Sequence, residues 1–308
     1  MLAESIEALR VNPDGVYVDV TFGGGGHSRA ILERLGHEGR LFAFDQDPDA
    51  KIESGKLANE NFTFIGENFR YLKNFLRLHG VRRIDGLIAD LGVSSHQFDV
   101  AGRGFSTRMD GDLDMRMDQR GDVTAADLVN NLDEADLTRL LRLYGELSNA
   151  RQMARDICSA RKNAPITTTF GLREAVSRQL PRGMENKYLA MLFQALRIEV
   201  NGELEALREM LRQAAGLLVP DGRLVVISYH SLEDRLVKNF MKTGNFDGEP
   251  EKDFYGNLLR PLRPVSSKAV VPSADELARN NRSRSAKMRV AEKLETLNND
   301  NDEQPIQK

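Results

Sequence analysis

The stretch VDVTFGGGGHS, from Val18 to Ser28, decides the fold class of this chain. An apolar run at residues 16–20 leads into four successive glycines, and a helix is predicted at 28–35. Because glycine has no Cβ, such a loop lets the backbone approach a ligand closely. In open α/β sheets, ligands bind beyond the carboxyl ends of the strands. We therefore expect residues 16–20 to be a strand of such a sheet, with the glycines at its ligand site.

Strands and helices alternate after the glycine loop. Short apolar runs predict strands at residues 40–44, 62–65 and 84–89, and the segments between them, 48–58 and 69–79, read as helices. This order implies a parallel sheet with right-handed crossovers. The predicted fold class is therefore α/β.

The alternation then stops for about ninety residues. Residues 105–121 form a loop rich in Asp, Arg and Met, and residues 124–187 show helical periodicity without a strand signal. Thr168 or Thr169 is a suitable N-cap for the last helix of this region. The α/β pattern resumes afterwards, which indicates a helical domain inserted into one α/β domain. Its predicted elements are a long helix at 193–218, a break at 219–222, a strand at 223–228 and a helix at 232–241.

Composition narrows the class of protein. The 308 residues are 41% apolar, enough for a full core, and the single cysteine, Cys158, excludes a disulfide framework or a Cys-rich zinc site. The first residues lack the pattern of a signal peptide. No apolar run approaches the roughly 20 residues of a membrane span. We expect a soluble, cytoplasmic protein.

Charge is unevenly distributed along the chain. The net charge is −3, but residues 139–187 carry ten Lys/Arg against four Asp/Glu, and residues 259–293 carry nine against three. Each block thus has a net charge of +6. They indicate either a surface for a large anionic substrate or solvated helix faces.

Asp45 adds a second signal to the glycine loop. It lies 20 residues beyond Gly25, at the end of the second predicted strand, where an acidic residue hydrogen-bonds ribose hydroxyls. The sixth position of the dinucleotide fingerprint is Ser28 instead of glycine, so the match to that motif is poor. Together, the glycine loop and Asp45 predict a cofactor that contains a nucleoside. This cofactor could be NAD or S-adenosylmethionine. The alternative for Asp45 is a solvated strand-end carboxylate.

The fourth strand favours methyl transfer. Asp90 ends it and is followed by Ser94, Ser95, His96 and Gln97. A nicotinamide site needs no such cluster of polar residues. Methylation of an exocyclic amine, by contrast, needs hydrogen-bond acceptors. They hold the N–H groups and turn the lone pair of the amine nitrogen toward the methyl carbon. Alignment of the reactants alone can lower the barrier by roughly 7–11 kcal/mol. The alternative is that these are polar residues of a turn.

No metal site is predicted. The segment DGDLDMRMD, residues 110–118, resembles a calcium loop, but Met115 and Gly121 stand where that motif requires Gly and Glu. The five histidines form no HExxH motif. We expect His27 to open a helix beside the cofactor.

Seven motifs together resemble the bacterial 16S ribosomal RNA (cytosine-N4)-methyltransferase family. The resemblance extends from the first residues to about residue 293. It implies a Rossmann-like S-adenosylmethionine domain with a helical insertion, and methylation of a cytidine in the decoding centre of the small ribosomal subunit. The motifs are FGGGGHSRAIL, DLGVSSHQFD, RGFS, DGDLDMRMD, FQALRIEVNGELEAL, ISYHSLEDRLVK and RSRSAKMRVAEK.

The resemblance also implies site residues. Two departures concern this site. His96 stands where the family usually has Pro, which affects the stiffness of the loop before Gln97. Met1-Leu2 stands where the family has a short His-containing segment, so we expect an edge of the cofactor site to be incomplete. The implied cofactor contacts are Gly25, Gly26, His27, Asp45, Phe69, Asp90 and Gln97.

We predict that Asp90 and the Ser94–Gln97 loop, with the hydroxyls of Ser94 and Ser95, join the cofactor to the acceptor. We also predict that Tyr229 and His230 stack on or orient the base. The predicted domains are residues 1–104 with 191–295 for methyl transfer, 105–190 for RNA recognition, and a disordered tail at 296–308. The expected partner is 16S rRNA in the small subunit, and the chain is a monomer or a homodimer. Rival functions are methylation of DNA cytosine or a small amine, a non-catalytic ribosome-binding factor and, more distantly, an NAD-dependent dehydrogenase.

Overall fold

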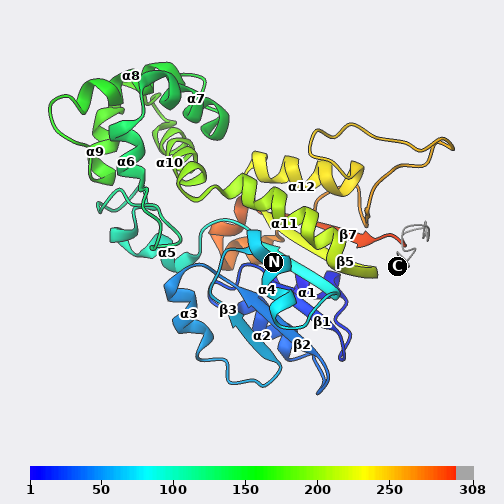
Figure 1. Ribbon diagram of the computed structural model, residues 1–308. Helices are drawn as coiled ribbons and strands as arrows, with labels where there is room; N and C mark the ends of the chain where they lie inside the picture. The colour runs from blue at the N-terminus through cyan, green and yellow to red at the C-terminus, as the bar shows by residue number, and fades with distance from the viewer. Residues whose placement is uncertain (296–308) are drawn as a thin grey trace, which may run out of the picture.

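A computed structural model describes residues 1–295, and within that range seven strands form one sheet in the order β3-β2-β1-β4-β5-β7-β6 (Figure 1). The predicted tail at 296–308 lies outside the described residues. The strands are β1 (Val16–Asp19), β2 (Arg40–Phe44), β3 (Phe62–Ile65), β4 (Ile84–Asp90), β5 (Leu218–Ser228), β6 (Leu262–Pro264) and β7 (Lys287–Lys293).

The sheet is mixed, because two strands that the sequence did not predict extend the predicted parallel strands. The neighbouring pairs from β3 to β5 are parallel, as predicted, whereas β7 pairs antiparallel with both β5 and β6. Antiparallel edge strands on a parallel sheet are common in doubly wound folds. Basic residues interrupt the apolar pattern of β7, which is why the sequence did not predict this strand.

Helices cover both faces of the sheet. Alternate residues of β2 serve the two faces: Phe42 and Phe44 join the core cluster under α4, α11 and α12, while Leu41 joins the cluster under α1 and α2. This two-sided burial explains why the strands read as nearly continuous apolar runs. The helices are α1 (Leu2–Leu9), α2 (Gly26–Leu32), α3 (Pro48–Ser54), α4 (Leu72–Leu78), α11 (Glu203–Leu217) and α12 (Ser231–Thr243).

The inserted helices form a second hydrophobic core beside the sheet (Figure 1). This cluster runs from Phe105 to Leu196, and the first core resumes at Ile198, within the same helix. Thr168 caps α9 by accepting the N–H of Gly171 at 3.0 Å, which confirms one of the two predicted N-caps. The helices are α6 (Ala125–Asn131), α7 (Glu134–Gly145), α8 (Ala150–Ala160), α9 (Thr169–Ala175) and α10 (Glu185–Asn201).

The long helix predicted at 193–218 is wrong. Gly202 adopts a left-handed conformation (φ 58°) that ends α10, and α11 begins at the next residue. The break allows α10 to pack in the inserted domain and α11 against the sheet.

The predicted break at 219–222 also differs, because these residues lie within β5. There Asp221 has a φ of 63° and the pairing with β4 shifts register, so the turn-like sequence produces a bulge in the strand.

None of the helices in residues 1–295 has an apolar stretch long enough to cross a membrane.

Candidate functional site

The carboxyl ends of four parallel strands bring most of the predicted site residues to one edge of the sheet. The glycine loop follows β1, Asp45 follows β2, Asp90 ends β4, and Tyr229 follows β5. β1 lies between β2 and β4 in the sheet, so the loop after β1 lies between the two carboxylates. The ends that the sequence predicted to meet therefore do meet.

The glycine loop contains one position where a side chain would clash and two where a side chain would meet open space. Gly25 has a φ of 74°, and a Cβ there would lie 2.8 Å from Cζ of Phe22, so only glycine fits. At Gly24 and Gly26, by contrast, a Cβ would meet no atom within 4 Å. Gly26 is the first residue of α2, so its open backbone lies at a helix N-terminus. This surface leaves space for a ligand to contact the main chain.

The Asp45 carboxylate is held by two backbone N–H groups. Gly23 donates to Oδ2 at 2.8 Å and Asp47 donates to Oδ1 at 2.9 Å. Burial is the main reason that the pKa of Asp45 rises to about 6, with the charges of Asp47 and Asp19 adding to it. Each oxygen keeps lone-pair capacity beyond its one N–H partner, so the carboxylate can accept ribose hydroxyls.

His27, in the first turn of α2, lies between two carboxylates. Its Nδ1 is 3.9 Å from Oδ2 of Asp90, and its Nε2 is buried without a hydrogen-bond partner in the described part of the chain. Asp19, at the end of β1, accepts the hydroxyl of Ser28 at 2.8 Å and is fully buried, which raises its pKa. A buried, unsatisfied ring nitrogen beside the glycine loop fits a site that a polar ligand completes.

Asp90 is anchored from both sides. Its backbone N–H donates to the Thr21 hydroxyl at 2.6 Å, and its Oδ1 accepts the hydroxyl of Tyr229 at 2.8 Å. Burial raises the pKa of Asp90 above its usual range, although His27 and the Tyr229 hydrogen bond act in the opposite direction. Burial and the Asp90 charge also raise the pKa of Tyr229, so the phenol keeps its proton and remains the donor.

The Ser94 and Gln97 side chains hold the loop after β4 together. Ser94 Oγ accepts the N–H of Gln97 at 3.2 Å, and Gln97 Oε1 accepts the N–H of Ser94 at 3.0 Å, which forms a capping box at the start of α5 (Ser95–Asp99). The Gln97 amide also donates to the Asp47 carboxylate. Ser95 begins α5, and its side chain lies outside the described part of the structure. His96 is exposed and pairs with Asp49 at 3.2 Å.

A buried arginine, which was not among the predicted site residues, connects this loop to the segment after β2. Arg103 is 6% exposed and pairs with Asp47 at 2.8 Å and Asp49 at 3.0 Å. It also donates to the backbone carbonyl of Arg116, in the loop that leads into the inserted helices, at 3.0 Å. Asp47 caps α3 by accepting the N–H of Asp49 at 2.9 Å, and nothing in the sequence pairs it with a residue 56 positions away.

Phe69 lies beside the edge strand β3. It begins the short 3₁₀ segment Phe69–Tyr71, which Asn68 caps by accepting the N–H of Arg70 at 2.9 Å. Its ring is half-buried against the main core. The contact with adenine that the resemblance implies stays a prediction.

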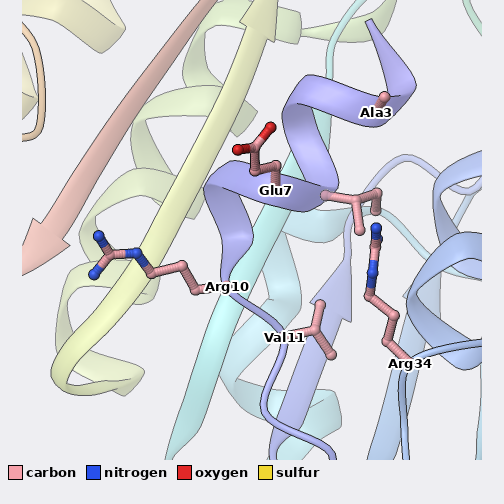
Figure 2. Close-up of a pocket in the computed structure, with 6 residues that line it drawn as sticks. Ala3, Glu7, Arg10, Val11 and Arg34 are labelled. Atoms are coloured by element: carbon pink, nitrogen blue, oxygen red, sulfur yellow. The ribbon is translucent and has the colours of Figure 1, made fainter.

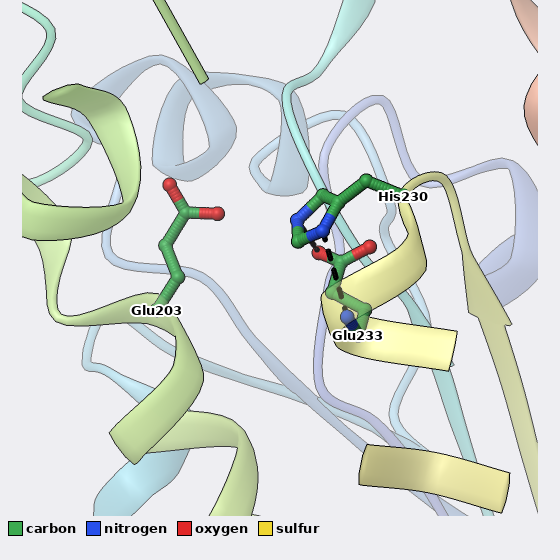
Figure 3. Close-up of side chains that lie close together, drawn as sticks. All are labelled: Glu203, His230 and Glu233. Atoms are coloured by element: carbon green, nitrogen blue, oxygen red, sulfur yellow. Dashed lines mark hydrogen bonds and ion pairs between the residues drawn. The ribbon is translucent and has the colours of Figure 1, made fainter. Parts of the chain in front are cut away.

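His230 belongs to a compact charged cluster with Glu203 and Glu233 (Figure 3). One ligand atom from each lies within 4.8 Å of the others, a spacing compatible with a metal ion. However, Arg197 already donates to both oxygens of Glu203, at 2.8 and 3.0 Å. The imidazole Nε2 lies 3.2 Å from Glu233, and Nδ1 accepts the Glu233 N–H at 3.5 Å. The guanidinium supplies the positive charge, so the cluster is better explained as an ion-pair group than as a metal site.

The two basic blocks differ in the structure. In the second block, Arg263 pairs with Glu292, and Lys287 and Arg289 pair with Asp234. At least three of its cations are therefore ion-paired within the fold. In the inserted domain, several cations of the first block are exposed on or beside the helices: Arg142, Arg151, Arg155, Lys162 and Arg178.

A shallow pocket lies elsewhere, between α1 and the end of α2 (Figure 2). It is lined by Glu7, Arg10 and Arg34 among others, and none of the predicted site residues contributes to it. This pocket is therefore separate from the predicted site.

The chain is similar to several known proteins. Residues 1–294 match the family model described as MraW methylase family. The chain is 55% identical over 294 residues to the "Ribosomal RNA small subunit methyltransferase H" of Flavobacterium johnsoniae, covering 96% of each chain. The protein of the same name from Bacteroides fragilis is 56% identical over 293 residues, 95% of this chain and 96% of that one. Among solved structures, an rRNA methylase from Streptococcus thermophilus aligns over 95% of both chains with a TM-score of 0.43 and 12% identity.

Proposed function

Since this chain belongs to the MraW methylase family, we propose that it transfers the methyl group of S-adenosylmethionine to N4 of a cytidine in the decoding centre of 16S rRNA, within the small ribosomal subunit. One observation carries the proposal. A glycine loop tied to a ribose-type carboxylate lies directly beside Asp90, a second carboxylate that has one oxygen occupied and one oriented toward His27.

The residues present suit the cofactor. Asp45 would accept the ribose hydroxyls, and the open backbone at Gly24 and Gly26 would contact the amino-acid end. Phe69 would face the adenine. The cofactor supplies an activated methyl group on a sulfonium, so the protein has mainly to align the acceptor with it.

Asp90 would hold the acceptor amine. Its Oδ1 accepts the Tyr229 hydroxyl, so Oδ2 is the oxygen that would accept an N–H of the target cytosine. A carboxylate with a raised pKa is a better proton acceptor at neutral pH, so Oδ2 is also the atom that would take the proton that N4 loses. The ring of His230, whose Nδ1 accepts the backbone N–H of Glu233, would stack on or orient the base.

The RNA substrate fits the inserted domain. Its exposed cations would contact phosphates, which position the RNA without reading its sequence. To reach Asp90, the target base must leave its stack, since enzymes that modify a base act on extruded or single-stranded nucleotides.

The deciding experiment measures transfer of labelled methyl from S-adenosylmethionine to small subunits purified from cells that lack this gene, followed by nucleoside analysis. We expect N4-methylcytidine at one position of 16S rRNA. Parallel reactions with naked rRNA and with DNA test the rival acceptors. Label in DNA but not in small subunits would refute the proposed substrate, and cofactor binding without transfer to any acceptor would support a non-catalytic factor. Full activity of D90A with normal cofactor affinity would remove Asp90 from the reaction.

A further inference from the structure

Glu233 is a buried carboxylate that the proposed reaction does not use. It lies in the first turn of α12 and is 3% exposed. Its Oε2 accepts the backbone N–H of Tyr229 at 2.9 Å, and its Oε1 lies 3.2 Å from Nε2 of His230. Burial alone would raise the pKa of Glu233, but His230, Arg197 and the Tyr229 N–H together lower it. The side chain is thus an anion enclosed by donors. It contacts His230 (Figure 3) and also Tyr229, the two residues that follow β5.

A short chain of contacts connects Glu233 to Asp90. Glu233 holds the backbone of Tyr229, and the hydroxyl of Tyr229 donates to Oδ1 of Asp90 at 2.8 Å. Gly92, with a φ of 100°, brings the loop after β4 against the same tyrosine: a Cβ there would be 3.5 Å from Cδ2 of the ring. The tyrosine therefore has its main chain fixed at one end and its hydroxyl committed at the other.

We propose that Glu233 is a positioning residue for methyl transfer: acting through Tyr229, it keeps Oδ1 of Asp90 occupied and so presents Oδ2 to the acceptor amine. This rests on the proposed function, in which Asp90 receives the amine N–H. The requirement is geometric, because in-line displacement depends on the direction of the nitrogen lone pair, and a misplacement of about 1 Å can cost on the order of 100-fold in rate.

The proposal is tested with E233A, E233Q, Y229F and the double variant Y229F/E233A in single-turnover methyl transfer to small subunits. We expect E233A and Y229F each to lower the rate constant roughly 10- to 100-fold, with less than about threefold change in KM for cofactor or subunit. The double variant should be no slower than the slower single variant, because both changes interrupt one chain of contacts. E233Q, which keeps an oxygen for the Tyr229 N–H, should recover most of the rate even if E233A folds poorly.

The matched control is D234N, which alters the adjacent carboxylate of the same helix. Asp234 is also ion-paired, but with Arg289 and Lys287 of β7 and not with the site. It should lower stability without changing the rate constant. The positioning role would be overturned if the rate losses of Y229F and E233A multiplied in the double variant. It would also be overturned if D234N lowered the rate constant as much as E233A does.

A second readout does not depend on activity. The Tyr229 hydrogen bond lowers the pKa of Asp90, so its loss should raise that pKa further. We expect the ¹³C-carboxyl titration of Asp90, assigned with D90N, to move to higher pH in Y229F and E233A and to stay unchanged in D234N. If wild-type protein methylated no ribosomal substrate, the proposed function would fail while this titration still tested the contact chain. An unchanged titration in E233A would overturn the chain itself.

Discussion

Oδ2 of Asp45 accepts the backbone N–H of Gly23 at 2.8 Å, so the acid after β2 and the glycine loop after β1 form one unit. The bond shapes the loop before any ligand arrives, and it uses only part of what the carboxylate can accept. A cofactor that bridged the two would find both halves already oriented.

Gly25 and Gly26 should respond differently to alanine. Gly25 has a left-handed φ and no room beside Phe22, so G25A should destabilise the protein by about 1–3 kcal/mol and weaken cofactor binding. G26A meets open space and lies at the start of a helix, so its stability should be unchanged or slightly higher while cofactor affinity falls at least tenfold. Urea unfolding and calorimetric titration separate the two effects. Normal affinity in G26A would mean that the cofactor does not approach this backbone.

Cofactor binding should weaken as the pH falls through about 6. The folded-state pKa of Asp45 is raised to about 6, so the free protein carries an ionised acceptor above that pH and a protonated carboxyl below it. If only the ionised form binds, the Kd rises about tenfold for each further pH unit. Titration with S-adenosylhomocysteine between pH 7.5 and 5 measures this. In D45N, affinity should already be low at pH 7.5 and nearly independent of pH, whereas a flat profile in wild-type protein would exclude Asp45 as the acceptor.

Arg103 should be far more important for stability than an exposed arginine. It is buried against Asp47, and R103A would leave that carboxylate without its cation, which typically costs about 3–5 kcal/mol. R103K should recover little, because one ammonium cannot reproduce contacts made by several guanidinium nitrogens. The control is R139A, whose arginine is 71% exposed and pairs with Asp136, with an expected change within about 0.5 kcal/mol. Similar unfolding free energies for R103A and R139A would contradict the assignment.

The exposed cations of α8 should contribute to RNA affinity. The double reversal R151E/R155E should weaken binding to the small subunit and reduce the slope of log affinity against log salt by roughly 1–2. Filter binding at several salt concentrations gives both quantities. The control is R77E/R82E, two exposed arginines near the opposite end of the strands, where the reversal should have little effect. Equal losses in both variants would point to general attraction and not to a defined surface.

Much of the sheet could be predicted because its signals are local. The apolar runs of β1 to β4 end at Asp19, Phe44, Ile65 and Asp90. The glycines after β1 indicate where the backbone turns. The helical insertion was also visible, because its apolar residues recur with helical spacing and no strand signal interrupts them. These patterns depend on residues a few positions apart.

The missed elements depend on distant partners. β7 is recognisable only against β5, where Arg223 faces Glu292 and forms an ion pair at 2.6 Å. The predicted helix at 193–218 divides at Gly202, because its first half packs mainly in the core of the inserted domain and its second half packs against the sheet. A single glycine in an amphipathic run does not indicate such a division. The short N-terminal α1 has no side-chain cap to mark its start.

The sequence by itself determined the order of strands and helices, the glycine loop and the acids at the strand ends, because each follows from short-range periodicity and backbone sterics. Only the tertiary structure decided how those acids are held. Tyr229 reaches Asp90 across 139 positions, and Arg103 reaches Asp47 across 56. Contacts of this kind form where parallel strands bring their ends together, and in a buried setting each carboxylate needs a donor whose identity no local pattern specifies.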